Sequence, residues 1–207
     1  MEMYFSLSKT QHDNKYNEIA SYILEEKKSK FIAYIFNISN DIEAKKYINR
    51  IKEDNKEARH IVYIYSFLSD NKLPIIHFSD DGEPQGTGTK AIYEVISKEN
   101  LTNVCIVIVR YFGGILLGAG PLSRAYLNAF RGALDKCKKE EVLNYNSRII
   151  SIEYNKYDSL NNLLKEYINK KYVIINEVKF NERIIINLSI ELKHIDEVED
   201  IIKNISY

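Results

Sequence analysis

The first third of the chain predicts two strands followed by a helix. Residues 18–25 and 30–38 are rich in β-branched and aromatic side chains that lack helical spacing, which favours strands. Apolar side chains then recur at positions 44, 47, 48 and 51, the spacing of one buried helix face. Asn40 precedes this run, and Glu43 follows three residues later, which is the pattern of a capping box. We therefore expect a helix that begins after Asn40.

The middle of the chain contains its most apolar segment. Residues 60–67 are predicted to form a strand and residues 89–98 a short helix. Residues 104–109 are apolar without interruption, as expected of a central strand that is buried on both faces. A further helix is predicted from Pro121, whose fixed φ suits a first helical turn, to about residue 138.

A change of pattern near residue 140 divides the chain into two predicted domains, 1–139 and 140–207. Polar residues at 138–141 and 144–147 indicate the linker. The second domain has the pattern strand, helix, strand, strand, helix, which is typical of a ferredoxin-like βαββα(β) domain with little chain left for its last strand. The predicted elements are 149–154, a helix capped by Asp158, 172–180, 183–191 and a helix through 195–205. The expected fold class is therefore α+β, in two domains.

Composition narrows the class of protein but leaves the partner open. The 207 residues are 45% hydrophobic and carry 29 basic and 29 acidic side chains, so attraction to a polyanion has to come from a local patch. No apolar run is long enough to span a bilayer, and the N-terminus lacks a signal-peptide core. A cytoplasmic protein without membrane contact is expected. Cys105 and Cys137 lack metal or disulfide spacing, which predicts packing roles, while His12 and His194 are expected at the surface.

A polar loop in the middle of the chain brings three carboxylates together. Asp80, Asp81 and Glu83 lie within four residues, and oxygens that converge in this way can bind a hard cation. With His60 and His77 nearby in sequence, a hydrolytic metal site is one hypothesis. In the alternative, the aspartates accept backbone N–H groups and Glu83 pairs with an arginine. The residues show no established ligand spacing, so neither a metal nor another cofactor is assigned.

Two glycine-rich segments open predicted helices. Residues 86–89 and 118–123 each place free N–H groups at the positive end of a helix dipole, which suits a phosphate. Ser123 and Arg124 add a hydroxyl and a guanidinium to the second segment. The lysine of a phosphate-binding P-loop is absent, so a nucleoside triphosphatase is not expected. The alternative role of these glycines is tight packing.

Arg110 directly follows the apolar segment 104–109 and requires a partner. An arginine at the end of a buried strand is seldom found without a carboxylate, phosphate or carbonyl group. We expect Arg110, with Arg124, to brace the three carboxylates, so that the two loops form one polar surface. His60 is a candidate for the same surface because it begins a strand just before this region. No catalytic nucleophile is evident, since Ser123 lacks a nucleophile-elbow setting.

Four segments of the chain resemble the YigZ/IMPACT family. They are Lys28-Ser29-Lys30-Phe31-Ile32-Ala33, Ala58-Arg59-His60, Ser79-Asp80-Asp81-Gly82-Glu83-Pro84-Gln85-Gly86-Thr87 and Arg110-Tyr111-Phe112-Gly113-Gly114-Ile115-Leu116-Leu117-Gly118-Ala119-Gly120. They occur in the family's order, and the C-terminal part resembles the small domain that bacterial members add.

The resemblance implies a fold and a role. The N-terminal domain is expected to have the left-handed βαβ fold of domain IV of elongation factor G, and the C-terminal domain to be ferredoxin-like, similar to domain V. Bacterial members are suspected RNA or ribosome binders, eukaryotic members act through protein contacts in the starvation response, and no enzymatic activity is implied. The sequence departs from the family pattern in residues 88–91 and at Leu116, Pro121 and Val62, where lysine, glycine and cysteine are usual. Loss of that lysine weakens the argument for a polyanion.

The family resemblance and the two polar loops together predict a non-enzymatic, translation-associated protein, with a role in the regulation of translation or a stress response, that contacts RNA or the ribosome through residues 80–87 and 110–124. The alternative is a metal-dependent hydrolase built on the three carboxylates, and a protein partner is the third hypothesis. No residue is assigned to catalysis. The residues assigned to binding are Asp80, Asp81, Glu83, Thr87, Arg110, Gly118, Gly120, Ser123, Arg124 and His60.

Overall fold

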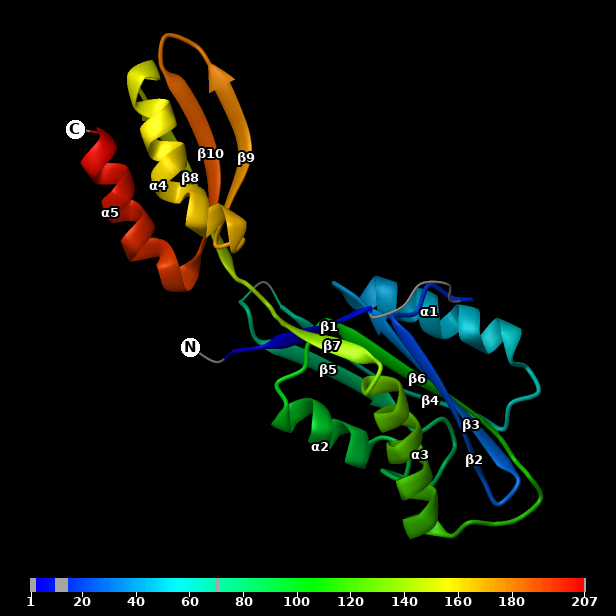
Figure 1. Cartoon of the computed structure of the whole chain (residues 1–207). Coiled ribbons are helices and arrows are strands. Elements are labelled where there is room, and N and C mark those ends of the chain that lie inside the picture. The colour runs from blue at the N-terminus through cyan, green and yellow to red at the C-terminus, as the bar shows by residue number, and fades with distance from the viewer. Residues whose placement is uncertain (1–2, 10–14, 70, 207) are drawn as a thin grey trace. The chain divides into compact units, whose positions relative to one another are not determined.

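The chain forms two compact units, each with its own sheet and apolar core. The structure, a computed structural model, describes residues 3–9, 15–69 and 71–206 (Figure 1). The units are Met1–Val142 and Leu143–Tyr207, where the sequence analysis placed the boundary at 139/140. The predicted α+β class and two-domain organisation are confirmed. His12, expected at the surface, lies outside the described residues.

A five-stranded antiparallel sheet is the centre of the first unit. Its strands, in spatial order, are β2 (Ala20–Glu26), β3 (Ser29–Asn37), β6 (Val104–Tyr111), β4 (His60–Leu68) and β5 (Pro74–Ser79). The apolar strand β6 lies in the middle, as predicted, and every residue of it before Tyr111 is buried. It can occupy this place because both faces of its pleat carry apolar side chains.

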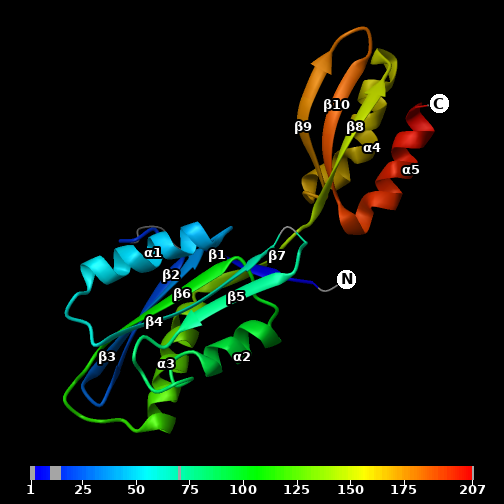
Figure 2. The ribbon, with the colours of Figure 1, turned by 180° about the vertical axis from the view of Figure 1, so that it is seen from behind.

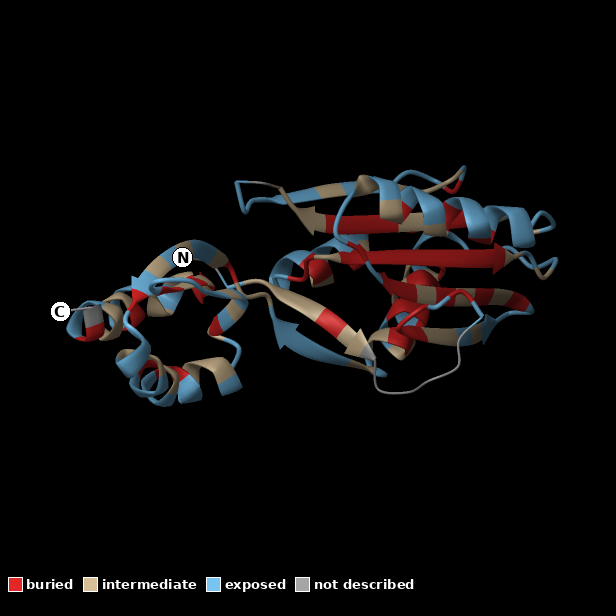
Figure 3. Cartoon of the chain, turned by 90° about the horizontal axis from the view of Figure 1, so that it is seen from above, coloured by how far each residue is buried: buried red, intermediate tan, exposed pale blue. Residues whose placement is uncertain are grey.

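Helices cover both faces of this sheet. Helix α1 (Asp41–Asp54) packs on one face, while α2 (Lys90–Lys98) and α3 (Ala119–Leu134) pack on the other (Figures 1 and 2). The buried residues, red in Figure 3, follow the inner strands and the inward sides of these helices. The start of α1 is the predicted one, since the Asn40 side chain accepts a hydrogen bond from the Glu43 N–H at 3.0 Å.

The connection from β3 through α1 to β4 is a split βαβ unit. Both strands pair antiparallel with β6, so they are parallel to each other and β6 lies between them. After this unit, β5 forms an edge of the sheet beside β4. Strand β5 was missed in the sequence because it begins with Pro74 and most of it is exposed.

The predicted linker at 138–141 is wrong, because these residues form a strand. Helix α3 ends at Leu134, and β7 (Cys137–Glu141) pairs antiparallel with β1 (Phe5–Lys9). Cys137 therefore lies on a strand and not on the predicted helix. Four of the five residues of β7 are exposed, so their side chains carry no buried-strand pattern. The pairing is specified by β1, more than a hundred residues earlier in the sequence, and not by local propensity.

The second unit has the predicted order of elements. It consists of β8 (Tyr145–Ile152), α4 (Tyr157–Asn169), β9 (Val173–Phe180), β10 (Ile184–Glu191) and α5 (Ile195–Ser206), with short 3₁₀ turns at Tyr154–Lys156 and Leu192–His194. The strand order β8-β10-β9 makes β8 and β9 parallel, with β10 between them. This is the ferredoxin-like arrangement without a fourth strand among the described residues. Residues 145–147, predicted as linker, belong to β8.

Candidate functional site

The Asp80 side chain caps the N-terminus of α2. Its Oδ2 accepts a hydrogen bond from the Gly86 N–H at 2.6 Å, and its Oδ1 accepts from the N–H groups of Gly88 and Thr89, both at 2.9 Å, and from the Thr89 hydroxyl at 3.0 Å. The Thr87 N–H donates to the Pro84 carbonyl at 2.9 Å. The phosphate site predicted at 86–89 is therefore wrong, because these donors are already used and the carboxylate faces the positive helix end.

Removal of the Asp80 carboxylate is expected to loosen the start of α2. Asp80→Ala should lower the free energy of unfolding by about 1–2 kcal/mol, as for other lost N-terminal caps. Asp80→Asn keeps one acceptor oxygen and should cost about half as much. Urea unfolding with amide hydrogen exchange at residues 86–90 measures both effects. Equal stability of the alanine variant and the natural protein would contradict this role.

Asp81 and His60 join the loop to the start of β4. The Asp81 Oδ2 accepts a hydrogen bond from the Ile61 N–H at 2.7 Å, and its carbonyl oxygen lies 2.7 Å from His60 Nδ1. A carbonyl oxygen can only accept, so the Nδ1 of His60 carries the proton. The other ring nitrogen, Nε2, faces Glu83 Oε2 at 3.7 Å. Asp81 itself has a positive φ of 47°, which sharply turns the chain at this point.

Glu83 and Arg110 form a buried ion pair that joins the two polar loops. Arg110 Nη1 donates to Glu83 Oε1 at 2.5 Å, and the two side chains are only 6% and 3% exposed. The Tyr126 hydroxyl donates to the same oxygen at 2.7 Å. Burial, and next the bond to Glu83, raise the pKa of Tyr126, so this hydroxyl remains a donor at neutral pH. Arg110 thus braces the carboxylate loop, as predicted, but through Glu83 alone, while Asp80 and Asp81 accept backbone N–H groups.

Arg124 does not take part in this brace. It is exposed on the first turns of α3, and no ion pair among the described residues joins it to Asp80, Asp81 or Glu83. The prediction that it braces the loop is wrong because α3 points its side chain toward solvent, while the buried position two residues later is held by Tyr126.

The three carboxylates do not form a metal site. Within the described parts of the chain, no group of three or more His, Cys, Asp or Glu side chains is placed to hold a metal ion. Asp80 and Asp81 accept backbone N–H groups, and Glu83 is paired with Arg110. These oxygens are therefore directed at separate partners and do not converge on one point, as a hard cation would require.

A cavity of about 540 Å³ lies beside this ion pair, and we call it the α3 cavity. Its lining residues come from the start of β4, both polar loops and the start of α3. They are Arg59, His60, Gly82, Glu83, Pro84, Arg110, Phe112, Leu116, Leu117, Gly118, Ala119 and Leu122. Four of the predicted binding residues line it, namely His60, Glu83, Arg110 and Gly118. The others surround it: Asp80, Asp81 and Thr87 belong to the supporting loop, while Gly120, Ser123 and Arg124 follow on α3.

Several lining residues were missed in the sequence. Arg59 is exposed and directly precedes His60. Phe112, Ile115 and Leu116 are 46%, 42% and 83% exposed, and we call these three side chains the apolar rim, of which Phe112 and Leu116 line the cavity. A single sequence gives little sign of this role. One arginine among many, and three apolar residues in a glycine-rich loop, could equally be buried or exposed. The family motifs that contain them were the available signal.

Gly113 holds the segment between β6 and α3 against the turn between β2 and β3. Its N–H donates to the Ser29 hydroxyl at 3.2 Å. A Cβ at this position would lie 2.0 Å from the backbone carbon of Lys28, so only glycine allows the two backbones to approach this closely. The position of the apolar rim therefore depends on this contact.

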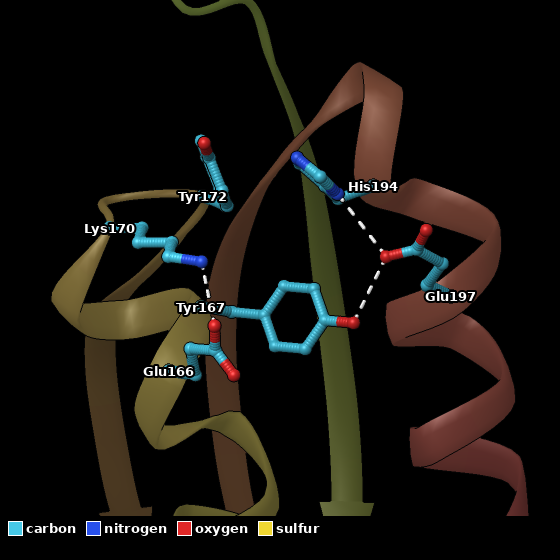
Figure 4. Close-up of a pocket in the computed structure, with 6 residues that line it drawn as sticks. All are labelled: Glu166, Tyr167, Lys170, Tyr172, His194 and Glu197. Carbon is cyan, nitrogen blue, oxygen red and sulfur yellow. Dashed lines mark hydrogen bonds and ion pairs between the residues drawn. The ribbon is translucent and has the colours of Figure 1, made fainter.

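A smaller cavity in the second unit is lined by side chains that already contact one another. It has a volume of about 210 Å³ and is lined by Glu166, Tyr167, Lys170, Tyr172, His194 and Glu197 (Figure 4). Lys170 pairs with Glu166 at 2.6 Å, and the Glu197 carboxylate accepts from the Tyr167 hydroxyl at 3.0 Å and lies 3.2 Å from His194 Nδ1. The Tyr172 ring stacks on His194 at 4.1 Å. These contacts tie α4 to α5 and indicate a structural role.

The fold and the cavity together define a two-domain α+β protein with a candidate binding site in its N-terminal unit. The chain belongs to the IMPACT family, since the model of the Impact N-terminal domain matches residues 27–134. The matched range includes both polar loops and the α3 cavity. The resemblance seen in the sequence motifs is confirmed.

Relatives and a solved structure extend this match beyond the N-terminal unit. The chain is 31% identical to the IMPACT family member YvyE of Bacillus subtilis (strain 168) over 166 residues, 80% of this chain and 74% of the relative. It is 29% identical to the IMPACT family member YigZ of Escherichia coli (strain K12) over 143 residues, 69% and 70% of the two chains. A crystal structure of a hypothetical protein matches 97% of this chain and 91% of its own, with a TM-score of 0.64 and 22% identity, which shows a shared fold.

Across the residues that the structure covers, none of the helices has the length and apolar character needed to cross a membrane.

Proposed function

We propose that this protein is a non-enzymatic, translation-associated binding protein that contacts RNA or the ribosome through the α3 cavity and the exposed residues around it. The place in translation is the one that its family resemblance implies. The observation that supports this contact surface is the direction in which its charged side chains point. The three carboxylates bond inward to backbone N–H groups and to Arg110, while Arg59 and Arg124 are exposed beside the cavity.

Local charge supports an RNA contact despite the neutral chain. Arg59 and Arg124 form no described ion pair with the carboxylates of the neighbouring loop, so their charge remains available to a phosphate. Binding to a phosphate backbone depends on such cations and weakens as salt rises, because bound counterions are released. This chain has Leu116 where the family usually has lysine, so the surface carries one cation fewer. We therefore expect only a few phosphate contacts.

An exposed aromatic ring favours the binding of single-stranded or looped RNA over the binding of an RNA duplex. Phe112 is 46% exposed and lines the cavity. Unpaired bases stack on such rings, whereas a regular RNA duplex keeps its bases within the helix. The same segment favours a protein partner as the second candidate, because Ile115 and Leu116 extend the apolar rim by two exposed aliphatic side chains. The metal-dependent hydrolase is not supported, since the carboxylates are internally bonded.

Sedimentation with purified ribosomes tests the proposed function. Arg59→Ala and Arg124→Ala should each weaken association by at least about threefold and reduce its salt dependence, since each removes one phosphate contact. Lys46→Ala is the matched control, because Lys46 is an exposed cation on α1, on the opposite face of the sheet. It should leave binding unchanged.

RNase treatment separates the two candidate partners. Association that persists after RNA is removed, and that depends on Leu116→Ser instead of on the arginines, would identify a protein partner. Absence of any association at low salt would refute the proposed function.

A further inference from the structure

The α3 cavity combines free N–H donors with apolar side chains. In its lining, α3 begins at Ala119 after Gly118, whose φ is 78°, and no side chain caps the helix. The N–H groups of Ala119 and Gly120 donate no hydrogen bond described by the structure, and Pro121 has none to donate. Two donors and the positive end of the helix dipole are therefore available.

Arg110, which lines the same cavity, gives independent evidence for a missing partner. Its side chain is 6% exposed and lines the cavity. One of its nitrogens is paired with Glu83, but the buried Nε has no hydrogen-bond partner within the described part of the chain. A buried donor of this kind usually has a partner, and a small shift of the Arg110 side chain, part of which lines the cavity, would bring the Nε to a ligand oxygen there.

The charges that face the cavity favour an anion. Glu83 is neutralised by Arg110, which leaves Arg59 and the start of α3 as the uncompensated positive groups. His60 uses its Nδ1 proton for the Asp81 carbonyl, so only its Nε2 remains for a ligand or for Glu83. At the N-terminus of α2, by contrast, the Asp80 carboxylate already accepts from the N–H groups of Gly86, Gly88 and Thr89.

The apolar part of the cavity lining fits a flat apolar group. Phe112, Leu116, Leu117 and Leu122 line it. The guanidinium of Arg110 lies 5.8 Å from the centre of the Phe112 ring, and the ring is nearly half exposed. A ring held in this way by a cation can stack a planar base on its open surface. The volume of about 540 Å³ lies within the range of small-ligand sites.

We propose that the α3 cavity binds one unpaired RNA nucleotide, with its phosphate at the N-terminus of α3 and at Arg59 and its base against Phe112. This inference rests on the proposed function and makes it more specific. It requires a single-stranded or bulged nucleotide, because a base within a duplex cannot reach the ring.

Titration of the full-length chain with 5′-mononucleotides tests the inference. Adenosine, uridine, guanosine and cytidine monophosphates, the corresponding nucleosides and inorganic phosphate are compared by amide chemical shifts. The mononucleotides should shift residues 112–120 and bind about tenfold more tightly than either the nucleosides or inorganic phosphate, because only they combine a phosphate with a base. Phe112→Leu, at an exposed position, should weaken mononucleotides by about fivefold or more and leave inorganic phosphate unchanged.

Arg59→Gln should weaken both the mononucleotides and inorganic phosphate, while Lys46→Gln serves as the control and should change neither. Equal affinity for inorganic phosphate and mononucleotides, or a stronger response to a free peptide carboxylate, would overturn the inference. Ribosome association that is insensitive to Phe112→Leu, together with no mononucleotide binding, would also overturn it, but would leave the proposed function standing. The proposed function fails separately, if no ribosome association is detected at all.

Discussion

Glu83→Ala is expected to lower the free energy of unfolding of the N-terminal unit by about 3–5 kcal/mol, the largest effect of any single substitution considered for this protein. The substitution leaves Arg110, 6% exposed, without its carboxylate and leaves the Tyr126 hydroxyl without an acceptor. A buried charge that loses its only partner has no compensation for the water it gave up on folding. Denaturant unfolding, with hydrogen exchange at β6 to separate the two units, measures the loss.

A double substitution distinguishes a missing charge partner from a missing side chain. Glu83→Gln combined with Arg110→Met removes both charges but retains an oxygen for Tyr126. It should recover at least half of the stability lost in Glu83→Ala, because no uncompensated charge remains. If the double variant is as unstable as the sum of its two single variants, the ion pair is not what holds the loops together.

Gly113→Ala is expected to have the second-largest effect, a loss of about 3 kcal/mol in the free energy of unfolding. The new Cβ would overlap the Lys28 backbone at 2.0 Å, and a backbone cannot move aside as a flexible side chain can. The segment from Phe112 to Gly118 should therefore shift, and ribosome association should fall with it. Calorimetry and ribosome sedimentation measure the two effects.

Gly120→Ala provides the matched control for this substitution. A Cβ at Gly120 would have Arg124 Nη1 as its nearest neighbour, at an ordinary 3.8 Å, and alanine favours a helix more than glycine does. This variant should be unchanged or more stable by up to about 1 kcal/mol. Similar losses in both variants would show that the close contact at Gly113 is not responsible.

The elements that the sequence predicted well are those whose signals are local. Asn40 and Glu43 lie three residues apart and form the predicted cap of α1. The run 104–109 is apolar on both faces, so its central place in the sheet follows from burial alone. The spacing of the apolar residues in α5 likewise predicts which side faces the core, and Val198 and Ile205 are buried there.

The elements that the sequence missed depend on distant partners. Strand β7 is a strand because β1 pairs with it, and four of its five side chains are exposed. Strand β5 has a similarly exposed surface at the sheet edge. In both cases the backbone pairing is supplied by another part of the chain, so residue types alone could not indicate it.

The candidate site was predicted in outline because an arginine at a buried strand end needs a partner. The sequence therefore correctly indicated that Arg110 contacts the carboxylate loop. It did not indicate which of the three carboxylates pairs with Arg110, or that Arg124 takes no part. The roles of Asp80 and Asp81 remained open in the sequence, since a carboxylate that binds a cation and one that accepts N–H groups look identical there. Arg59 and Phe112 were missed because their importance arises only from their position at the cavity.

These contacts make the two polar loops a rigid frame for the surface around the α3 cavity. Asp80 fixes the start of α2, Glu83 and Arg110 join the loops through the interior, and Gly113 fixes the outer segment. Many polar residues in this region bond to one another within the frame, so they do not themselves face a binding partner. It also identifies Arg59, Phe112 and Arg124 as informative positions for binding experiments, because their substitution should not disturb the frame.

Ultraviolet cross-linking of the full-length chain to ribosomes, followed by mass spectrometry of the cross-linked peptides, tests the central claim most directly. RNA adducts are predicted on peptides that contain residues 59–60 and 112–124, and these adducts should decrease in Arg59→Ala but not in Lys46→Ala. Adducts confined to α1 or to Leu143–Tyr207, or ribosome association without any adduct at residues 112–124, would contradict the account.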